Sequence, residues 1–497
     1  MKTRINLTLV CLLLACFFSC KKESKIQETT TYDQFVEDFK AKGIATGNLL
    51  VYKNGKIIHQ STNGIKSINP LDSLTLNSQF RLASVSKQFT GMAIMKLKEA
   101  GKLDYDQKVN TILTACPYDK ITIRQLLNHT SGITDYERFL STNWKPEDPN
   151  KKYILGNDEI LELFFAKHAD VDFEAGEQWD YSNTGYLVLA SIVEKISGQH
   201  FRDFLKETIF DPVGMSNTTL YKYQIAPDAA MPNRVFGYET SLDRNSYEIN
   251  DYNLVNDVRG DGGIYSTLED LFKWNMALAN YTIISKEALK EAWTPGKLNN
   301  GEETDYGFGW NINSKTNEPM IVSHSGGWVG FGTFLRNEVD AKSGFVLLTN
   351  NSFEYFGDIL NALESIYKGE DYKFPKYPVE QVLAEKLLNE GIEKGTTFYH
   401  KIKNDTVNYA VSEGRLNALG YRLLNKDHLE EALSVFKLNI EEHPAAANPY
   451  DSYGDALLIK GDSIKALEYF KKCFAMDSTL GFAKDKADKL ETALKRK

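Results

Sequence analysis

The sequence predicts an α+β fold for the larger part of the chain and an all-helical fold for residues 413–497. Strand-like runs occur near both ends of the larger part, at residues 49–59 and 320–348, and helical spacing occurs between them. This order favours an antiparallel sheet whose faces are covered by helices. A 34-residue internal repeat in the last part favours paired helices.

Composition places the chain among folded globular proteins. It has 497 residues, of which 25% are charged and 42% hydrophobic, and this excludes disordered, collagen-like and multi-span membrane classes. The 58 Lys and Arg against 67 Asp and Glu give a formal net charge of -9. Because no basic tract is present, we expect no nucleic-acid partner.

Residues 1–19 are typical of an export signal. Two basic residues precede an apolar stretch, residues 7–18, that is too short to span a membrane comfortably. Cys20 follows this stretch, leads into a polar segment, and resembles the lipid-attachment site of bacterial lipoproteins. We therefore expect a lipid on Cys20 that anchors the protein in a membrane, facing the periplasm or the cell surface. Lipidation at Cys16 and plain secretion remain alternatives.

The predicted elements follow in order after a polar tether at residues 20–34. Asn54-Gly55 is a turn dipeptide between two apolar runs, so residues 49–52 and 57–59 should form a hairpin. Helical spacing is found at residues 88–100, 158–167, 185–196 and 268–278. Ser266 and Glu269 match a capping box at the start of the last of these helices. Further strands are expected at residues 320–323, 328–335 and 344–348.

Two copies of one pattern align at an offset of 34 within residues 413–497. The matched pairs are Leu419-Gly420 with Tyr453-Gly454, Leu423 with Leu457, Ala432 with Ala466, and Phe436 with Phe470. This pattern resembles the tetratricopeptide repeat, in which small residues lie where helices cross and large ones lie between them. Because two copies rarely form a stable array, residues 369–412 are expected to be a linker with a degenerate first helical unit.

Ser84 and Lys87 are the candidate nucleophile and base. Their three-residue spacing at the start of a predicted helix places both on one face. A serine hydroxyl needs a neighbouring base to become a nucleophile, and an amine is a base only when it is neutral. Burial beside a helix N-terminus would favour the neutral form of Lys87. Further Ser-x-x-Lys copies begin at Ser19, Ser365 and Ser434, so this motif needs support from its context.

Four ordered motifs resemble the serine beta-lactamase superfamily. They are FRLASVSK at residues 80–87, LLNHTSGI at 126–133, GEQWDYSN at 176–183 and HSGG at 324–327. The motifs are most similar to the class C branch, with its D,D-carboxypeptidases, D-aminopeptidases and family VIII esterases. The resemblance covers residues 35–368 and implies a beta-lactamase/transpeptidase-like fold with a helical subdomain.

The resemblance also implies residue roles. Ser84 is acylated, Lys87 and Tyr181 share proton transfer, and Asn183 binds the substrate amide. A second Tyr-x-Asn, at residues 52–54, falls on the predicted hairpin turn and is interpreted as structural. His129 and Ser131 invite interpretation as a catalytic pair. The family instead implies that their segment closes a helix behind the site.

The third motif has His324 where the best-known version of the family has lysine. By resemblance, His324 and Gly326 bind substrate, and the backbone N–H groups of Ser84 and Gly327 form the oxyanion hole. Histidine is ordinarily mostly neutral at pH 7, whereas lysine is a cation that attracts a carboxylate, so beta-lactam hydrolysis is a weaker expectation. Lys342 begins a Lys-Ser-Gly alternative that reads as a surface turn.

These patterns predict a serine hydrolase that acts through a Ser84 acyl-enzyme on a small peptide, ester or amide substrate. D-Amino peptidase, D,D-carboxypeptidase and esterase activities remain open. The sequence lacks the motifs of zinc proteases and phosphate-binding loops, so we expect no metal and no cofactor. The alternative is a non-enzymatic scaffold lipoprotein. The repeats are expected either to bind a protein or peptide partner or to form a structural lid or dimer surface.

Overall fold

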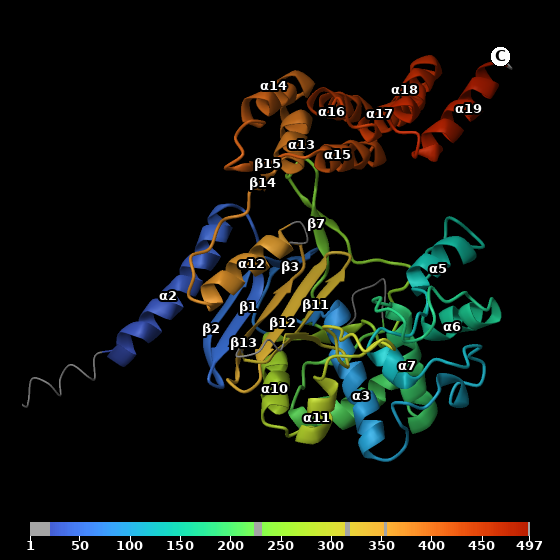
Figure 1. Cartoon of the computed structure of the whole chain (residues 1–497). Helices are drawn as coiled ribbons and strands as arrows, with labels where there is room; N and C mark the ends of the chain where they lie inside the picture. The colour runs from blue at the N-terminus through green and yellow to red at the C-terminus, as the bar shows by residue number, and fades with distance from the viewer. Residues whose placement is uncertain (1–19, 223–230, 314–318, 352–354, 496–497) are drawn as a thin grey trace, which may run out of the picture. The chain divides into compact units, whose positions relative to one another are not determined.

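The structure, a computed structural model, describes residues 20–222, 231–313, 319–351 and 355–495 (Figure 1). The predicted signal at residues 1–19, with Cys16, lies outside the described residues, as does the side chain of Cys20. Two compact units are present. The first consists of Met1–Glu239 and Ile249–Tyr372, and the second of Thr240–Glu248 and Lys373–Lys497.

A six-stranded antiparallel sheet forms the centre of the first unit, in the order β10-β11-β12-β13-β1-β2. Its strands are β1 (Gly47–Lys53), β2 (Lys56–Asn63), β10 (Asn311–Asn313), β11 (Ile321–Trp328), β12 (Phe331–Glu338) and β13 (Ser343–Thr349). Asn54 and Gly55 turn between β1 and β2 with φ of 51° and 70°, which confirms the predicted hairpin. Because β1 pairs with β13, the two ends of the unit meet inside the sheet.

Alternating side chains of β1 fill two cores, one on each face of the sheet. Leu49 and Val51 pack in one core with α2 (Cys20–Ala41) and α12 (Phe356–Tyr367), which lie against the same face in Figure 1. Leu50 and Tyr52 point into the larger core, which contains α3 (Lys87–Glu99), α7 (Asn183–Ser197) and α10 (Leu268–Ala279). The residues expected to be a tether are thus helical, and Phe35 and Phe39 anchor that helix.

The four helices predicted from spacing are present as α3, α6 (Asn157–Ala166), α7 and α10. One detail of the prediction is wrong. The N-cap of α10 is Thr267, whose side chain accepts from the backbone N–H of Asp270, because Ser266 still belongs to strand β9 (Ile264–Ser266) and its hydroxyl lies 2.7 Å from that of Thr218. Glu269 therefore closes no capping box with Ser266.

Shorter elements complete the first unit and its helical subdomain. They are β3 (Ile65–Ile68), β4 (Leu71–Ser73), β5 (Phe80–Arg81), η1 (Ala83–Ser86), η2 (Val109–Thr111), α4 (Ile123–Leu127), α5 (Tyr136–Asn143), α8 (Phe201–Leu205), η3 (Lys206–Phe210), α9 (Asp211–Val213), β6 (Thr219–Leu220) and α11 (Lys286–Ala292). Within the described ranges, none of the helices has the length and apolar character needed to cross a bilayer.

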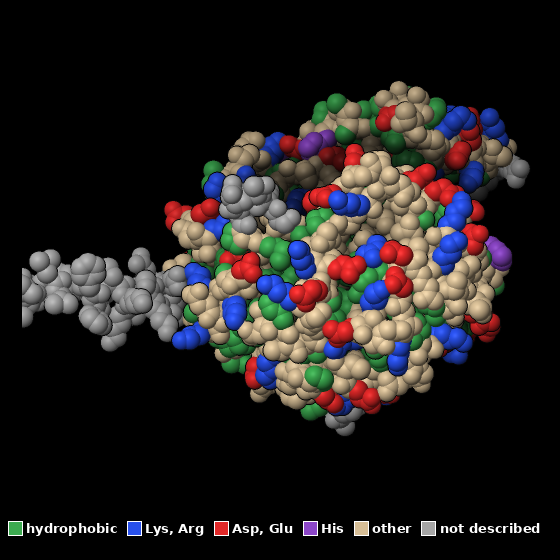
Figure 2. Space-filling view, turned by 60° about the horizontal axis from the view of Figure 1, so that its bottom comes forward, with side chains coloured by type: hydrophobic (Ala, Val, Ile, Leu, Met, Phe, Trp, Pro, Cys, Tyr) green, Lys and Arg blue, Asp and Glu red, His purple; other side chains and the backbone are tan. Residues whose placement is uncertain are grey.

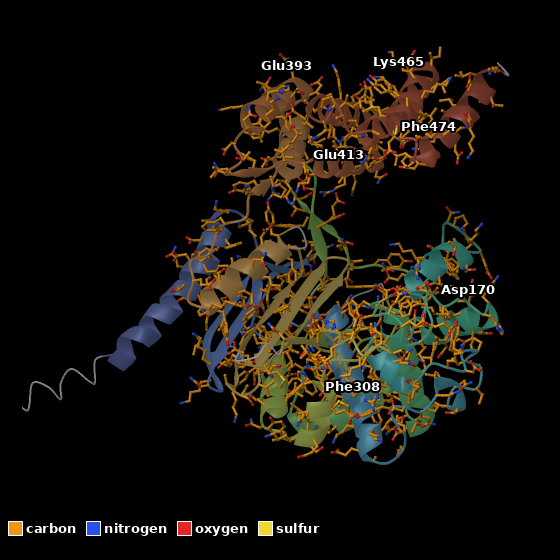
Figure 3. All side chains as sticks on the ribbon, in the orientation of Figure 1. Asp170, Phe308, Glu393, Glu413, Lys465 and Phe474 are labelled. Carbon is orange, nitrogen blue, oxygen red and sulfur yellow. The ribbon has the colours of Figure 1, made fainter. Side chains whose placement is uncertain are left out.

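The second unit is built from consecutive helices. They are α13 (Val379–Glu390), α14 (Ile392–Ile402), α15 (Glu413–Asn425), α16 (Leu429–Glu442), α17 (Asn448–Ile459), α18 (Ser463–Met476) and α19 (Gly481–Lys495), with the short strands β14 (Tyr377–Pro378) and β15 (Tyr409–Ala410). Figure 3 labels Glu393 in α14, Glu413 in α15 and Lys465 in α18. The pairs α15/α16 and α17/α18 coincide with the two repeat copies expected from the 34-residue offset.

Equivalent contacts recur in the two helix pairs. A Cβ atom added to Gly420 would lie 2.3 Å from the ring of Phe436, and one added to Gly454 would lie 2.7 Å from the ring of Phe470. Each glycine thus allows a phenylalanine of the next helix to approach the backbone. The matched small and large residues of the sequence pattern are the residues that meet in space.

Residues 240–248 belong to the second unit although they interrupt the first one in sequence. They comprise the last residue of β7 (Tyr238–Thr240), the turn that follows and the first two residues of β8 (Tyr247–Ile249). Leu242 packs against the core of the helical unit, and Arg244 donates to the side-chain oxygen of Gln381 at 2.7 Å.

Acidic and basic side chains are interspersed on the face of the molecule seen in Figure 2, in keeping with a sequence without a basic tract.

Candidate active site

Ser84 and Lys87 lie where the chain passes from a strand into a helix. Strand β5 ends at Arg81, Ser84 lies in the short helix η1, and Lys87 begins α3. Lys87 is fully buried, and its Nζ donates to three oxygens: Ser84 Oγ at 3.1 Å, Asn183 Oδ1 at 2.7 Å and the backbone carbonyl of Asp261 at 3.1 Å. A buried ammonium needs such partners, and here one of them is a serine hydroxyl.

Tyr181 and Asn183 bring the second part of the site against Lys87. Nζ of Lys87 lies 4.9 Å from the centre of the Tyr181 ring. Asn183 is the first residue of α7, and its backbone N–H donates to the Asp135 carboxylate at 2.9 Å. The structure therefore brings together Ser84 and Lys87 of one motif with Tyr181 and Asn183 of another, 94 or more residues further along the chain.

His129 lies behind Tyr181. Its ring centre is 4.2 Å from that of Tyr181, and its Nδ1 accepts from the backbone N–H of Ser182 at 3.2 Å. Complete burial, followed by the charge of Lys87, lowers the pKa of His129 well below its usual value, so the imidazole is neutral. Ser131 Oγ instead accepts from the backbone N–H of Ile133 in a local turn. These contacts favour the structural interpretation of this segment over a catalytic pair.

The third motif lies on strand β11, and His324 faces the protein interior. The side chain of His324 is buried, its Nδ1 is 2.6 Å from the carbonyl of Ser325, and its Nε2 is 2.8 Å from the Tyr306 hydroxyl. This geometry requires an Nδ1–H donor and a hydroxyl that donates to Nε2. Burial and then the charge of Lys87 lower the pKa of His324 to about 3. Both ring nitrogens of a neutral imidazole are thus used within the protein.

Gly326 lets strand β11 pass close to the segment that carries Ser84. A Cβ atom at this position would lie 2.2 Å from the Leu82 carbonyl and 2.4 Å from the Thr333 hydroxyl. The Thr333 hydroxyl also donates to the Leu82 carbonyl at 2.7 Å. A side chain at Gly326 would therefore separate β11 from the nucleophile segment, and with it the two backbone N–H groups expected to form the oxyanion hole.

A cavity of about 370 Å³ opens beside the nucleophile. Ser84, Asn183 and Gly327 line it together with Arg81, Tyr136, Glu137, Asn253, Val255, Asp261 and Trp328. A small acyl group fits a space of this size, next to a serine held by a buried lysine. His324 does not line this cavity, whereas Gly327 of the same strand does. The predicted absence of a metal and a cofactor stays a prediction.

Sequence reasoning missed three groups that hold the site together. They are the Asp261 carbonyl, which accepts from Lys87, the Asp135 carboxylate, which fixes the start of α7, and the Tyr306 hydroxyl, which bonds His324. A backbone carbonyl carries no residue-type signal. Gly260, directly before Asp261, was an available sign of close approach, since a Cβ atom there would lie 2.2 Å from the Tyr186 carbonyl and its φ is 108°.

Comparison with known proteins identifies the family. Residues 32–364 match the family model described as Beta-lactamase. Penicillin-binding protein 4* of Bacillus subtilis (strain 168) is 38% identical over 344 residues, which cover 67% of this chain and 75% of that protein. D-aminopeptidase of Brucella anthropi is 25% identical over 310 residues, an alignment that covers 61% of this chain and 56% of that protein.

Solved structures share the fold. A penicillin binding protein from Bacillus halodurans aligns with a TM-score of 0.56 and 26% identity, over 67% of this chain and 98% of that one. D-amino acid amidase from Ochrobactrum anthropi SV3 aligns with a TM-score of 0.54 and 21% identity, over 68% of this chain and 97% of that one. The matched family model spans the six-stranded sheet and every residue placed around Ser84, and the chain therefore belongs to the beta-lactamase family of serine hydrolases.

Proposed function

We propose that the protein hydrolyses a small peptide, amide or ester through an acyl-enzyme on Ser84. The observation that supports this most is the fully buried Lys87, whose Nζ lies 3.1 Å from Ser84 Oγ. This contact holds an amine within hydrogen-bond distance of the serine hydroxyl, which is the geometry that proton transfer between the two groups requires. Relatives named penicillin-binding protein, D-aminopeptidase and D-amino acid amidase support the same reaction class.

The proposed reaction has two steps. Ser84 Oγ attacks the substrate carbonyl carbon while its proton passes to Lys87 or Tyr181, and the oxyanion is held by the N–H groups of Ser84 and Gly327. Collapse breaks the bond to the leaving group, which receives that proton. Water then attacks the acyl carbon, gives its proton to the same base, and releases the acid with Ser84 restored.

The state of His324 favours substrates that are not held by a carboxylate. A neutral imidazole with both nitrogens used internally supplies no cation at the third motif. We therefore place esters and amides before beta-lactams in the order of expected turnover. The type of bond, and whether the substrate is a D-amino acid derivative, are decided by a comparison of p-nitrophenyl esters, D-Ala dipeptides and nitrocefin.

Mass spectrometry of the intact protein tests the nucleophile. A fluorophosphonate or penicillin probe should add one adduct at Ser84, and Ser84→Ala should lose both the adduct and hydrolysis of the preferred substrate. Ser141→Ala is the matched control, because that hydroxyl donates to the carbonyl of Arg138 within its own helix and is exposed. Hydrolysis that survives in Ser84→Ala contradicts the assignment and favours the scaffold alternative.

For the N-terminus we propose lipid attachment at Cys20, after export, with the hydrolase facing the periplasm or the cell surface. The support is the order of a basic start, an apolar stretch and a cysteine followed by polar residues. Metabolic labelling with a fatty-acid analogue should mark the wild type and not Cys20→Ala. Labelling that depends on Cys16 would contradict this proposal. We also propose that the helical repeats bind a protein or peptide partner, and the support for this is the repeat pattern of the sequence.

A further inference from the structure

The amine of Lys87 makes all of its hydrogen bonds to uncharged oxygens. They are Ser84 Oγ, Asn183 Oδ1 and the backbone carbonyl of Asp261. Although the side chain of Lys87 is fully buried, it forms no ion pair with any residue that the structure describes. A buried charge without a counter-charge is costly, so any carboxylate held near Lys87 affects how readily this amine accepts a proton.

Asp261 supplies such a carboxyl group. Its backbone carbonyl lies 3.1 Å from Lys87 Nζ, so the side chain of the same residue is held close to the amine. This side chain is 7% exposed and lines the cavity beside Ser84. Its Oδ2 accepts from the hydroxyl of the fully buried Tyr136 at 3.0 Å. The Tyr136 hydroxyl therefore holds the Asp261 carboxyl in place.

The backbone next to Asp261 is fixed as well. Thr90 of α3 donates to the carbonyl of Gly260 at 2.6 Å. A Cβ atom at Gly260 would lie 2.2 Å from the carbonyl of Tyr186 in α7, so the chain passes close to that helix. Helix α3 carries Lys87 at its start. Movement of Asp261 away from Lys87 would thus require both helices to shift.

Ionisable groups face the Asp261 carboxyl from three elements. They are Lys87 of α3, Arg81 of β5, and Asp135, Tyr136 and Glu137 at the start of α5. Burial raises the pKa of Asp261, and the charge of Lys87 is the strongest influence in the opposite direction. The Tyr136 hydroxyl and the charge of Arg81 also lower this pKa, whereas the charge of Asp135 raises it. Lys87 is thus the cation that stabilises the Asp261 carboxylate most.

We propose that the Asp261 carboxylate is the counter-charge of Lys87, which makes Asp261 a positioning residue for the base. As Ser84 Oγ bonds to the substrate carbonyl carbon, its proton moves to Lys87 Nζ, and an ammonium group forms in a buried place. The Asp261 carboxylate stabilises this ammonium group and does not receive the proton, because the carbonyl of Asp261 is the group that contacts Nζ. This inference rests on the proposed function, since it assumes that Lys87 accepts the serine proton.

The pH dependence of Ser84 labelling tests the inference without requiring turnover. The rate constant for labelling by an uncharged fluorophosphonate is measured over the pH range in which the full-length protein stays folded. Asp261→Asn keeps the backbone carbonyl and an oxygen that can accept from Tyr136, but it removes the negative charge. Because an opposite charge favours the ionised amine, this variant should move the rising limb of the profile to lower pH by about 1 unit and lower its plateau.

Two further variants complete the test. Tyr136→Phe should move the rising limb in the same direction by a smaller amount, because it removes a hydrogen bond that lowers the pKa of Asp261. Asp170→Asn is the control and should leave the profile unchanged, since Asp170, which Figure 3 labels, is an exposed aspartate beyond the end of α6. Circular dichroism checks that each variant folds.

The outcomes separate the two proposals. If Ser84 is labelled but the profile of folded Asp261→Asn is unshifted, or falls by the same factor at every pH, the inference is overturned and the serine hydrolase stands. Should Asp261→Asn not fold, an unshifted profile in Tyr136→Phe overturns the inference in the same way. If wild-type Ser84 is not labelled at all, the proposed function fails, and the inference fails with it.

Discussion

The two units place different kinds of residue at their centres. In the hydrolase unit, three ionisable side chains, Lys87, His129 and His324, are at most 3% exposed, and Lys87 contacts Ser84. In the helical unit, a glycine packs against a phenylalanine ring in each helix pair, at Gly420 with Phe436 and again 34 residues later at Gly454 with Phe470. Contacts of the first kind join segments 96 to 251 residues apart, as in Lys87 with Asn183 and Thr333 with Leu82. We therefore expect one substitution at the site to abolish activity, whereas a substitution in one repeat should weaken only the contacts of that repeat.

Removing the buried charge of the hydrolase unit should have the largest effect. Lys87→Met deletes three hydrogen bonds and the proposed base, and we expect kcat/KM for the preferred substrate to fall by at least about 10³-fold. Lys96→Met in the same helix is the control, since Lys96 forms only a partly exposed pair with Glu99. Circular dichroism checks that both variants fold. Equal kcat/KM in Lys87→Met and the wild type would rule out a role for this amine.

Filling one glycine of the helical unit should cost less and affect that unit alone. Gly420→Ala places a methyl group against Phe436, so we expect the free energy of unfolding to fall by about 1–3 kcal/mol. Gly414→Ala in the same helix meets no atom within 4 Å and should be neutral or slightly stabilising. Urea unfolding and hydrolysis are measured together. Loss of hydrolysis in folded Gly420→Ala would show that the packing of the repeat and the activity at Ser84 depend on each other.

The buried histidines predict a pH dependence of stability. His324 has a pKa of about 3 when folded and an ordinary value when unfolded, so the unfolded state binds more protons between these values. Stability should fall as pH is lowered below 6.5, by about 2 kcal/mol at pH 5 from this group. His324→Gln should flatten the profile, whereas His400→Gln, at an exposed position of α14, should leave it unchanged. A profile that stays as steep in His324→Gln would contradict the neutral, buried imidazole.

The smallest effect is expected at the rim of the cavity. The raised pKa of Glu137, from an ordinary value of 4.5 to about 7, means that the folded state keeps this proton where the unfolded state has lost it, so stability falls as pH rises from 4.5 to about 7 and the loss stays constant above pH 7. Glu137→Gln should raise the melting temperature at pH 8 by about 1 °C and leave it unchanged at pH 5, as scanning calorimetry would show. A larger rise in melting temperature at pH 5 than at pH 8 would contradict the raised pKa of Glu137.

The comparison also explains what could be predicted from the sequence. Asn54-Gly55 predicted its hairpin because the turn chemistry is local, and the offset of 34 predicted the Gly420 and Phe436 contact because the repeat is regular. Four motifs predicted which side chains gather at Ser84. The inward orientation of His324 was not predictable, because it depends on a hydrogen bond to Tyr306, which lies in the loop between α11 and β10. Likewise Ser266 and Thr267 are equal capping candidates until the end of β9 is known.

The excursion at residues 240–248 has a consequence for the ancestry of the chain. The polypeptide leaves the hydrolase unit, contributes Leu242 and Arg244 to the helical unit, returns, and departs again after Tyr372. A gene fusion that appended helices to a finished hydrolase would have needed a single junction. Here the helical unit is built from two separate stretches of the chain, so removal of the helices after Tyr372 would leave Leu242 and Arg244 without the contacts that they make in that unit.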